Sequence, residues 1–488
     1  MSRADLEPER PFAIARTAAK RSTLQSVCTL AVFALALAGC SGATTSSTPA
    51  TGETSSPRTA GALVDADGDP ILPPPPNVPD GVLSPEVQDD LDALFTDITL
   101  GLNFDAAERI GSSGDARLAW LLTDLMRFIP AGPNSGLADA FEALTGFKPE
   151  GPQSIWNETT NALIAWDIPA PPNYTKWKRI PFELVEPRWA PFFDDENSEI
   201  EWRIYSWGGV LLDGRDRNAA DQPCPRGCIP ALNDPATTTA AGGDWYADDR
   251  TVFGIVVDGE ARAYPKNIME VHEMVNTTLG GRRVAIPYCT LCGSAQAYVT
   301  DNVEGFDTLE IRTSGLLARS NKVMFDLDNR SVFDTFTGRA LSGPLHDAGV
   351  TLEQLTVVTS TWADWKVAHP DTTIVAQDGG IGRIYPDDPL RGRDDDGPIF
   401  PVGDVDPRLG VHEAVIGVVT ADGTALALPT DQIRAAIAAG ESPGLNDIVI
   451  QSDGGGFRAE QGGTEIATHE SFWFAWSQFH PDTLLWQR

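Results

Sequence analysis

The stretch "VFGIVVDGEARAYP" (residues 252–265) decides the fold of the larger part of this 488-residue chain. Two β-type apolar runs flank Asp258-Gly259, a residue pair that favours a tight hairpin turn. The stretch recurs as "VIGVVTADGTALALP" at residues 415–429, with one inserted residue. A hairpin that occurs twice predicts a duplicated β-rich domain. Short helical segments between further β-type runs make the predicted fold class α+β.

A second segment repeats in the same order. "WADWKVAHPDTTIV" (362–375) recurs 111 residues later as "WFAWSQFHPDTLLW" (473–486). The two hairpins are 163 residues apart, so the second copy is the shorter one. We therefore predict a first repeat over residues 205–380 and a shortened second repeat over 381–488. Only the first contains "IPYCTLCGSAQ" (286–296), so we expect the second repeat to have kept the fold without the site.

The N-terminus carries a different kind of signal. Lys20 and Arg21 precede the apolar run "VCTLAVFALALAGC" (27–40), which ends in Leu-Ala-Gly-Cys. A basic segment, a short apolar run and small residues before a cut site are typical of a secretory signal peptide. The last four residues resemble the lipobox of bacterial lipoproteins, which implies lipid attachment at Cys40. We predict a signal peptide over 1–39 and a protein that is exported and lipid-anchored to the bacterial cell envelope.

Two further regions lie between the anchor and the repeats. Residues 40–80 are rich in Ser, Thr and Pro and predict a disordered tether. Residues 81–204 read as a helical, Trp- and Pro-rich region. Its first helix should begin with Ser84 as N-cap and Pro85 in the first turn. The Trp cluster that follows could stack on a sugar, but buried packing is its commoner role.

The charge of the chain excludes one class of partner. Lys and Arg number 36 against 69 Asp and Glu, a net charge of −33. This charge repels nucleic acid phosphates and anionic headgroups, so we expect no nucleic acid partner. Contact with a membrane is then expected only through the lipid at Cys40. The residues indicate no particular protein partner.

Four of the six cysteines remain after Cys28 leaves with the signal peptide and Cys40 is acylated. Export permits disulfides, and "CPRGC" predicts one between Cys224 and Cys228. This disulfide lies outside the stretch that we expect to hold the functional site. We expect that site at the other two cysteines, Cys289 and Cys292.

Cys289 and Cys292, two residues apart and followed by Gly, admit several kinds of site. Both thiolates could bind one transition metal ion, zinc, copper or iron, with His272 as the best further ligand. The pair could instead be a redox couple. It could also be a static disulfide in a surface interaction protein. An enzyme using either cysteine as nucleophile, with His272 as base, is a further reading. No nucleotide-binding, serine-hydrolase or zinc-protease motif occurs.

Residues 205–488 resemble the prokaryotic family called domain of unknown function 3179. The resemblance rests on an ordered set of segments: "CIPALNDP" (228–235), "GEARAYP" (259–265), "HEMVN" (272–276), "YCTLCGSA" (288–295), "SGLLARSNKVMFD" (314–326), "TGRALSGPL" (337–345) and "WADWKVAHPDT" (362–372). The family implies where a site lies but no reaction. Residues of these segments are expected to be its neighbours: Tyr264, Glu273, Asn276, Ser294, Arg312 and Ser314. Thr290 departs from the family's usual Pro, and Cys224 and Cys228 are not part of its usual pattern.

Overall fold

The computed structural model describes residues 72–488 apart from 97, 130–131, 152–153, 218, 220–223, 225–226 and 394–396. The predicted signal peptide, Cys40 and most of the predicted tether lie outside the described residues. Within the described part, none of the helices is both long and apolar enough to cross a membrane. Lipid anchoring stays a prediction, because Cys40 lies outside the described residues.

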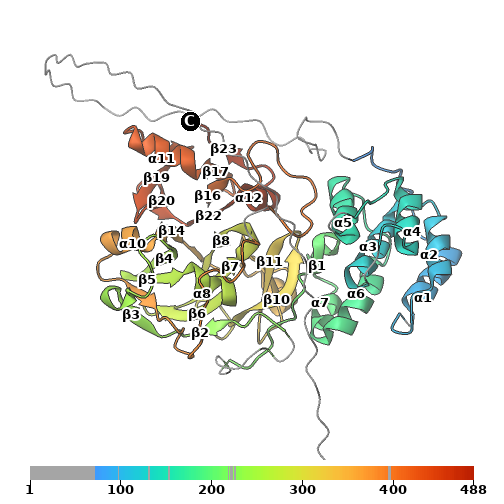
Figure 1. Cartoon of the computed structure of the whole chain (residues 1–488), viewed down its shortest axis with the longest axis horizontal. Coiled ribbons are helices and arrows are strands. Elements are labelled where there is room, and N and C mark those ends of the chain that lie inside the picture. Colours follow the sequence, from blue (N-terminus) through green and yellow to red (C-terminus); the bar gives the residue numbers. More distant parts are fainter. Residues whose placement is uncertain are drawn as a thin grey trace, which may run out of the picture. The chain divides into compact units, whose positions relative to one another are not determined.

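Helices form the first part of the described chain (Figure 1). They are α1 (Pro85–Phe95), α2 (Phe104–Gly111), α3 (Ala119–Phe128), α4 (Gly136–Thr145), α5 (Ile155–Ala165), α6 (Tyr174–Val185) and α7 (Ala190–Asp194). The predicted start of α1 is confirmed, because Ser84 Oγ accepts a hydrogen bond from the N–H of Val87. Trp120, Trp156, Trp177 and Trp189 are buried in one core with the apolar faces of these helices. The Trp-rich region is thus packing, as expected.

The quoted hairpin is β4 (Thr251–Val257) and β5 (Glu260–Pro265), which turns at Asp258 and Gly259 with positive φ. It lies in a five-stranded sheet of order β14-β4-β5-β15-β3. The other strands are β14 (Val358–Thr361), β15 (Thr373–Val375) and β3 (Thr237–Thr239), with the helices α8 (Lys266–His272) and α10 (Trp362–Ala368) between strands of the sheet.

The second hairpin, β16 (Ala414–Val419) and β17 (Ala425–Pro429), forms a sheet of order β22-β16-β17-β23. Its partners are β22 (Thr468–Phe472) and β23 (Leu484–Leu485), with α11 (Thr430–Ala438) and α12 (Trp473–Phe479). Each element matches one of the first sheet in order and direction, including a parallel last pair, β5 with β15 and β17 with β23. The fold is therefore β-rich and duplicated, with helices before the sheets, and this prediction is confirmed.

The same packing arrangement occurs within each of the two copies. In each hairpin a Trp ring packs against one strand, and the strand has a glycine at the point of contact. A Cβ on Gly254 would lie 2.3 Å from the Trp365 ring, and one on Gly417 would lie 2.0 Å from the Trp476 ring. The indole N–H of each Trp donates to a threonine hydroxyl at 2.9 Å. The repeated Trp and Thr residues are therefore structural.

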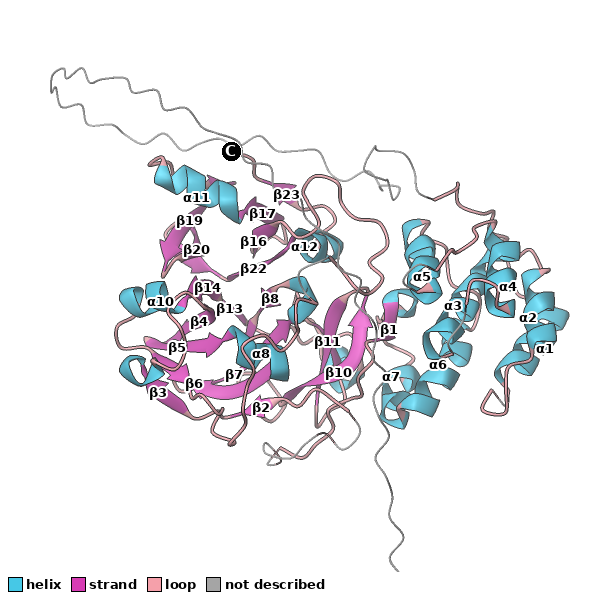
Figure 2. Ribbon diagram, viewed as in Figure 1, coloured by secondary structure: helices cyan, strands magenta, loops and turns pink. Residues whose placement is uncertain are grey.

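Three further sheets complete the β-rich part (Figure 2). One is β13 (Gln354–Leu355), β9 (Ala297–Val299), β7 (Arg282–Cys289), β6 (Met274–Leu279) and β2 (Leu232–Asn233), with β8 (Ser294–Ala295) beside β7. Another is β1 (Tyr205–Trp207), β10 (Ile311–Ala318), β11 (Asn321–Asp326) and β12 (Val332–Asp334), followed by α9 (Gly343–Asp347). The third is β18 (Gly444–Leu445), β19 (Ile448–Asp453), β20 (Gly456–Gln461) and β21 (Thr464–Ile466). The exact domain boundaries given above stay predictions.

Candidate functional site

Strand β7 ends at Cys289, and a short 3-10 turn over Thr290–Cys292 brings the two cysteines together. Gly293 then takes a left-handed φ of 59°, which lets the chain reverse into β8. The sulfurs of Cys289 and Cys292 are joined in a disulfide. The predicted Cys224–Cys228 disulfide is present as well. All four cysteines in the described part of the chain are therefore paired.

The two sulfurs of the Cys289–Cys292 bond have different surroundings. Cys289 lines a cavity, and its Sγ lies 3.5 Å from the backbone N–H of Lys322. Cys292 is fully buried, and its Sγ lies 2.9 Å from Oδ1 of Asn321. A backbone N–H favours a thiolate, whereas a carbonyl oxygen favours a protonated thiol. The pair is thus asymmetric in access and in hydrogen bonding.

The cavity beside Cys289 has a volume of about 210 Å³. Apolar side chains form much of its wall: Val210, Ile229, Leu291, Leu316, Leu317, Leu390 and Phe400. Polar groups lie among them, namely Glu270, Glu273, Thr290, Thr313, Ser320, Lys322 and Arg393. An apolar pocket with a few convergent polar groups and a reactive atom is the usual form of a small-molecule site.

Glu273 and Lys322 form a salt bridge in this cavity. Lys322 Nζ lies 3.2 Å from Glu273 Oε2 and donates to Thr313 Oγ1 at 2.9 Å. Burial lowers the pKa of Lys322, and the charge of Glu273 opposes that shift. Glu273 has a φ of 50°, a strained conformation for a residue with a side chain. Such strain is concentrated at functional positions.

Both ring nitrogens of His272 are held by groups other than the cysteines. Its Nδ1 lies 2.7 Å from the Pro230 carbonyl oxygen, which can only accept, so Nδ1 carries the proton. Its Nε2 then accepts from the Tyr385 hydroxyl at 2.7 Å. Burial lowers the pKa of His272 to about 4, so the ring is neutral near pH 7.

These contacts bear on the predicted metal site. Cys289 and Cys292 are bonded to each other, and neither nitrogen of His272 has a free lone pair. In this oxidised arrangement the three residues do not fit a Cys2His metal centre, which needs thiolates and an open imidazole nitrogen. Metal binding stays a prediction for the reduced protein.

The other predicted neighbours are mostly structural. Tyr264 is fully buried in the core of the first repeat. Asn276 joins two sheets through hydrogen bonds to both backbone groups of Ile311. Ser294 accepts from the amide of Gln296, and Ser314 Oγ donates to the Val323 carbonyl oxygen at 2.6 Å. Of the predicted neighbours, Glu273 lies in the cavity beside Cys289.

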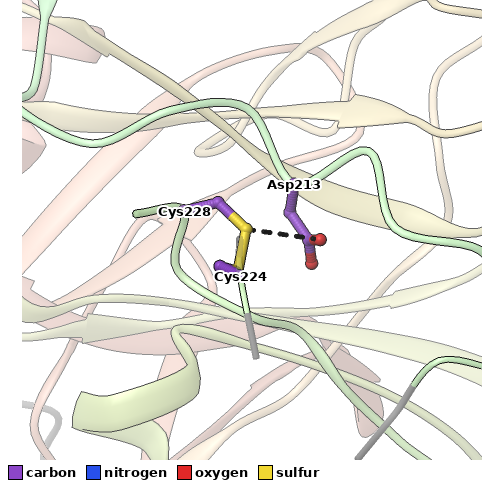
Figure 3. Close-up of side chains that lie close together, drawn as sticks. All are labelled: Asp213, Cys224 and Cys228. Atoms are coloured by element: carbon purple, nitrogen blue, oxygen red, sulfur yellow. Dashed lines mark hydrogen bonds between the residues drawn. A yellow bond between two sulfur atoms is a disulfide. The ribbon is translucent and has the colours of Figure 1, made fainter. Parts of the chain in front are cut away.

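Arg312 belongs to a second polar cluster, built around Asp213. Figure 3 shows Asp213 beside the Cys224–Cys228 disulfide. Asp213 Oδ1 lies 3.7 Å from Cys228 Sγ and forms salt bridges with Arg215 at 2.7 Å and, through Oδ2, with Arg312 at 3.0 Å. Burial would raise the pKa of Asp213, but the two arginines outweigh it and hold the pKa below its usual value. The ligand atoms of Asp213, Cys224 and Cys228 lie within 4.8 Å of one another. Because the sulfurs are bonded and the carboxylate is neutralised, this cluster is structural.

The second repeat lies against the cysteines, contrary to our expectation that it kept only the fold. Trp473, Phe474 and Trp476 of α12 share a buried core with Cys289 and Cys292. A Cβ on Gly293 would lie 2.9 Å from the Phe472 ring. The residue type at position 293 is therefore limited by the second repeat, which contributes directly to the site.

Sequence reasoning missed Lys322, Thr313, Asn321 and Gln478. Lys322 could have been found, because a lysine inside the apolar strand run "KVMF" (322–325) indicates a buried cation that needs a partner. Thr313 and Asn321 carry no comparable signal. Gln478 lies on a helix of the other repeat, and spacing in the sequence gives no hint of its contact with Asn321.

Fold and site together define a β-rich protein with a duplicated sheet and a disulfide at the wall of a small cavity. Residues 226–463 match the model of a family described as "Protein of unknown function (DUF3179)", and through them the chain belongs to that family. No curated protein and no solved structure matches the chain. The resemblance read from the sequence is thus confirmed for the family, and the family supplies no activity.

Proposed function

We propose that Cys289–Cys292 is a redox-active disulfide that exchanges with small thiol compounds bound in the adjoining cavity. The observation that carries this proposal is the asymmetry of the two sulfurs. Cys289, although only 3% exposed, lines the cavity, whereas Cys292 is fully buried and is not among the lining residues. Redox cysteine pairs divide their roles in this way, with an accessible sulfur that is attacked and a covered sulfur that resolves the mixed disulfide.

The exchange is balanced in atoms and electrons. A substrate thiolate attacks Sγ of Cys289, which forms a mixed disulfide and releases Cys292 as a thiolate that takes up a proton. A second substrate thiolate attacks the bound substrate sulfur and releases Cys289. Two substrate thiols become one substrate disulfide, and the protein disulfide becomes a dithiol. The reverse sequence reduces a substrate disulfide.

The salt bridge between Lys322 and Glu273 supports both the oxidation of substrate thiols and the reduction of a substrate disulfide. Lys322 is a buried cation on the wall that Cys289 shares, and a nearby positive charge favours thiolates. Its backbone N–H also points at Cys289 Sγ. Glu273 balances the charge of Lys322 and holds it in place at 3.2 Å. The small cavity volume favours a low-molecular-weight thiol over a folded protein.

We further propose that the protein acts outside the cytoplasm, anchored by a lipid on Cys40. The signal-like N-terminus and four paired cysteines support this, because disulfides persist in oxidising compartments. Metabolic labelling with a radioactive fatty acid should mark the wild-type chain and leave Cys40→Ser unlabelled. Equal labelling of both would overturn the anchor.

The redox proposal is tested by equilibrating the purified protein with glutathione buffers of defined potential. Quantitative alkylation and peptide mass spectrometry then report the state of each cysteine pair. We expect Cys289–Cys292 to be reduced within the range of about −180 to −300 mV that cellular thiol pools span, with Cys224–Cys228 as the internal structural control. With Cys292→Ser, glutathione should be trapped on Cys289. A Cys289–Cys292 bond that survives the whole range would make it a static disulfide and overturn the proposal.

A further inference from the structure

We propose that the second repeat sets the redox equilibrium of the first. Gln478 on α12 orients Asn321 so that its carbonyl oxygen accepts a hydrogen bond from the reduced Cys292 thiol. This inference rests on the proposed redox function and adds the residues that tune it. It assigns Asn321 and Gln478 as positioning residues, outside the cavity and without contact to a substrate.

The orientation of both side-chain amides follows from one backbone group. Gln478 contacts the carbonyl oxygen of Val402 at 2.8 Å, and a carbonyl can only accept, so the contacting atom is Nε2. Gln478 Oε1 therefore faces Asn321, whose Nδ2 donates to it at 3.1 Å. This leaves Oδ1 of Asn321 facing Cys292 Sγ at 2.9 Å. The chain of contacts fixes which amide atom meets the sulfur.

The contact with Asn321 differs between the two redox states. In the disulfide, Cys292 Sγ carries no hydrogen and cannot donate. Asn321 is fully buried, and within the described part of the chain no N–H or O–H group donates to its Oδ1. On reduction the new thiol S–H points at this oxygen and satisfies it. Because a buried acceptor gains a donor only in the dithiol, Asn321 favours the dithiol over the disulfide.

The first repeat shows that the glutamine is not required by the fold. The Trp residues of α10 and α12 match at an offset of 111, which places Val367 opposite Gln478. The Val367 side chain is 81% exposed. The same helical position therefore faces solvent in one copy and reaches the disulfide through Asn321 in the other. This difference is what a tuning role predicts.

The test measures the dithiol–disulfide equilibrium constant of the Cys289–Cys292 pair in dithiothreitol buffers by alkylation and mass spectrometry. Asn321→Leu keeps the side-chain size and removes the acceptor. We expect its equilibrium to shift about fivefold toward the disulfide, about 20 mV at ~30 mV per tenfold. Gln478→Leu frees the Asn321 amide to rotate and should shift the equilibrium in the same direction.

Two controls keep the outcome interpretable. Val367→Leu changes the matching position of α10 and should leave the equilibrium within twofold of wild type. Asn321→Asp keeps an acceptor oxygen and should not move toward the disulfide. If Asn321→Leu does not fold, Gln478→Leu carries the test alone. A reversible wild-type pair with unshifted Asn321 and Gln478 variants overturns this inference alone, whereas a wild-type pair that cannot be reduced overturns the redox function as well.

Discussion

Lys322 Nζ lies 3.2 Å from the carboxylate of Glu273, and both side chains line the cavity that Cys289 opens into. Lys322 lies on strand β11 and Glu273 directly follows helix α8, so the salt bridge joins a strand to a helix end at the wall of the cavity. Each charge is costly to bury alone. The pair therefore serves both the stability and the chemistry of the site.

Glu273→Gln should destabilise the protein, because Lys322 then keeps its charge in a buried place without a counter-charge. We expect a loss of about 3 kcal/mol in the free energy of unfolding, measured by urea denaturation. Replacing both partners, with Glu273→Gln and Lys322→Met, should restore much of this loss. A double variant as unstable as the single one would contradict the pairing.

The two thiols of the reduced protein should react at different rates. Cys289 opens into the cavity and Cys292 is fully buried, so iodoacetamide should modify Cys289 at least tenfold faster. Timed alkylation followed by peptide mass spectrometry measures both rates in one sample. Equal alkylation rates of the two thiols, in a protein whose circular dichroism is unchanged, would show that their different surroundings do not control the access of iodoacetamide.

Acid should weaken the folded state through His272. Burial lowers the pKa of His272 in the folded protein to about 4 from an ordinary 6.5, so between these values the unfolded chain binds more protons. The contribution of His272 to the free energy of unfolding is fully present above pH 6.5 and falls as the pH drops. It levels off below pH 4, after a loss of about 3 kcal/mol. Urea denaturation across this range should show a shallower slope for His272→Gln. Parallel curves for wild type and variant would assign the acid sensitivity to other groups.

The glycines under the two repeated Trp rings should not tolerate a side chain. In Gly417→Ala the new Cβ would meet the Trp476 ring at 2.0 Å, so the sheet must open or the ring must leave the core. We expect a loss of about 3 kcal/mol or failure to fold, read from thermal denaturation. Gly410→Ala is the matched control, since its nearest neighbour would be 3.9 Å away. A tolerated Gly417→Ala would contradict the close packing in the second copy.

Asp213 should matter more to stability than the disulfide beside it. The Cys224–Cys228 bond closes a short loop, so a double change to Ser should cost about 2 kcal/mol. Asp213→Asn removes a counter-charge that two buried arginines share, of which Arg312 keeps a salt bridge to Glu310 at 2.9 Å, and should cost about 4 kcal/mol. Urea denaturation of both variants gives the order directly. The reverse order would make the disulfide the principal element of this cluster.

Much of the fold could be predicted from the sequence, because a repeated hairpin and a repeated Trp segment define both copies of the sheet. The position of the cysteine pair could also be predicted from the sequence. The residues around the pair could not, because contacts between elements far apart in the chain leave no periodic pattern in the sequence. The ring of His272 precedes the site in sequence yet points to Pro230 and Tyr385, and Glu273, the next residue, faces the cavity. A one-residue step in the chain, at a position with a left-handed backbone, decides which of the two side chains lines the cavity with Cys289.

The hydrogen bond between Asn321 and Gln478 joins residues 157 positions apart in the sequence. A nascent or partly folded chain therefore holds its reactive cysteines before the amide that faces them is fixed. Contacts of such long range form late in folding. Until α12 docks, the Cys289–Cys292 disulfide should have the reduction potential of a disulfide in a short peptide. Only the fully folded protein should give the pair its final reduction potential. Maturation of the protein and activation of its cysteine pair would then be a single event.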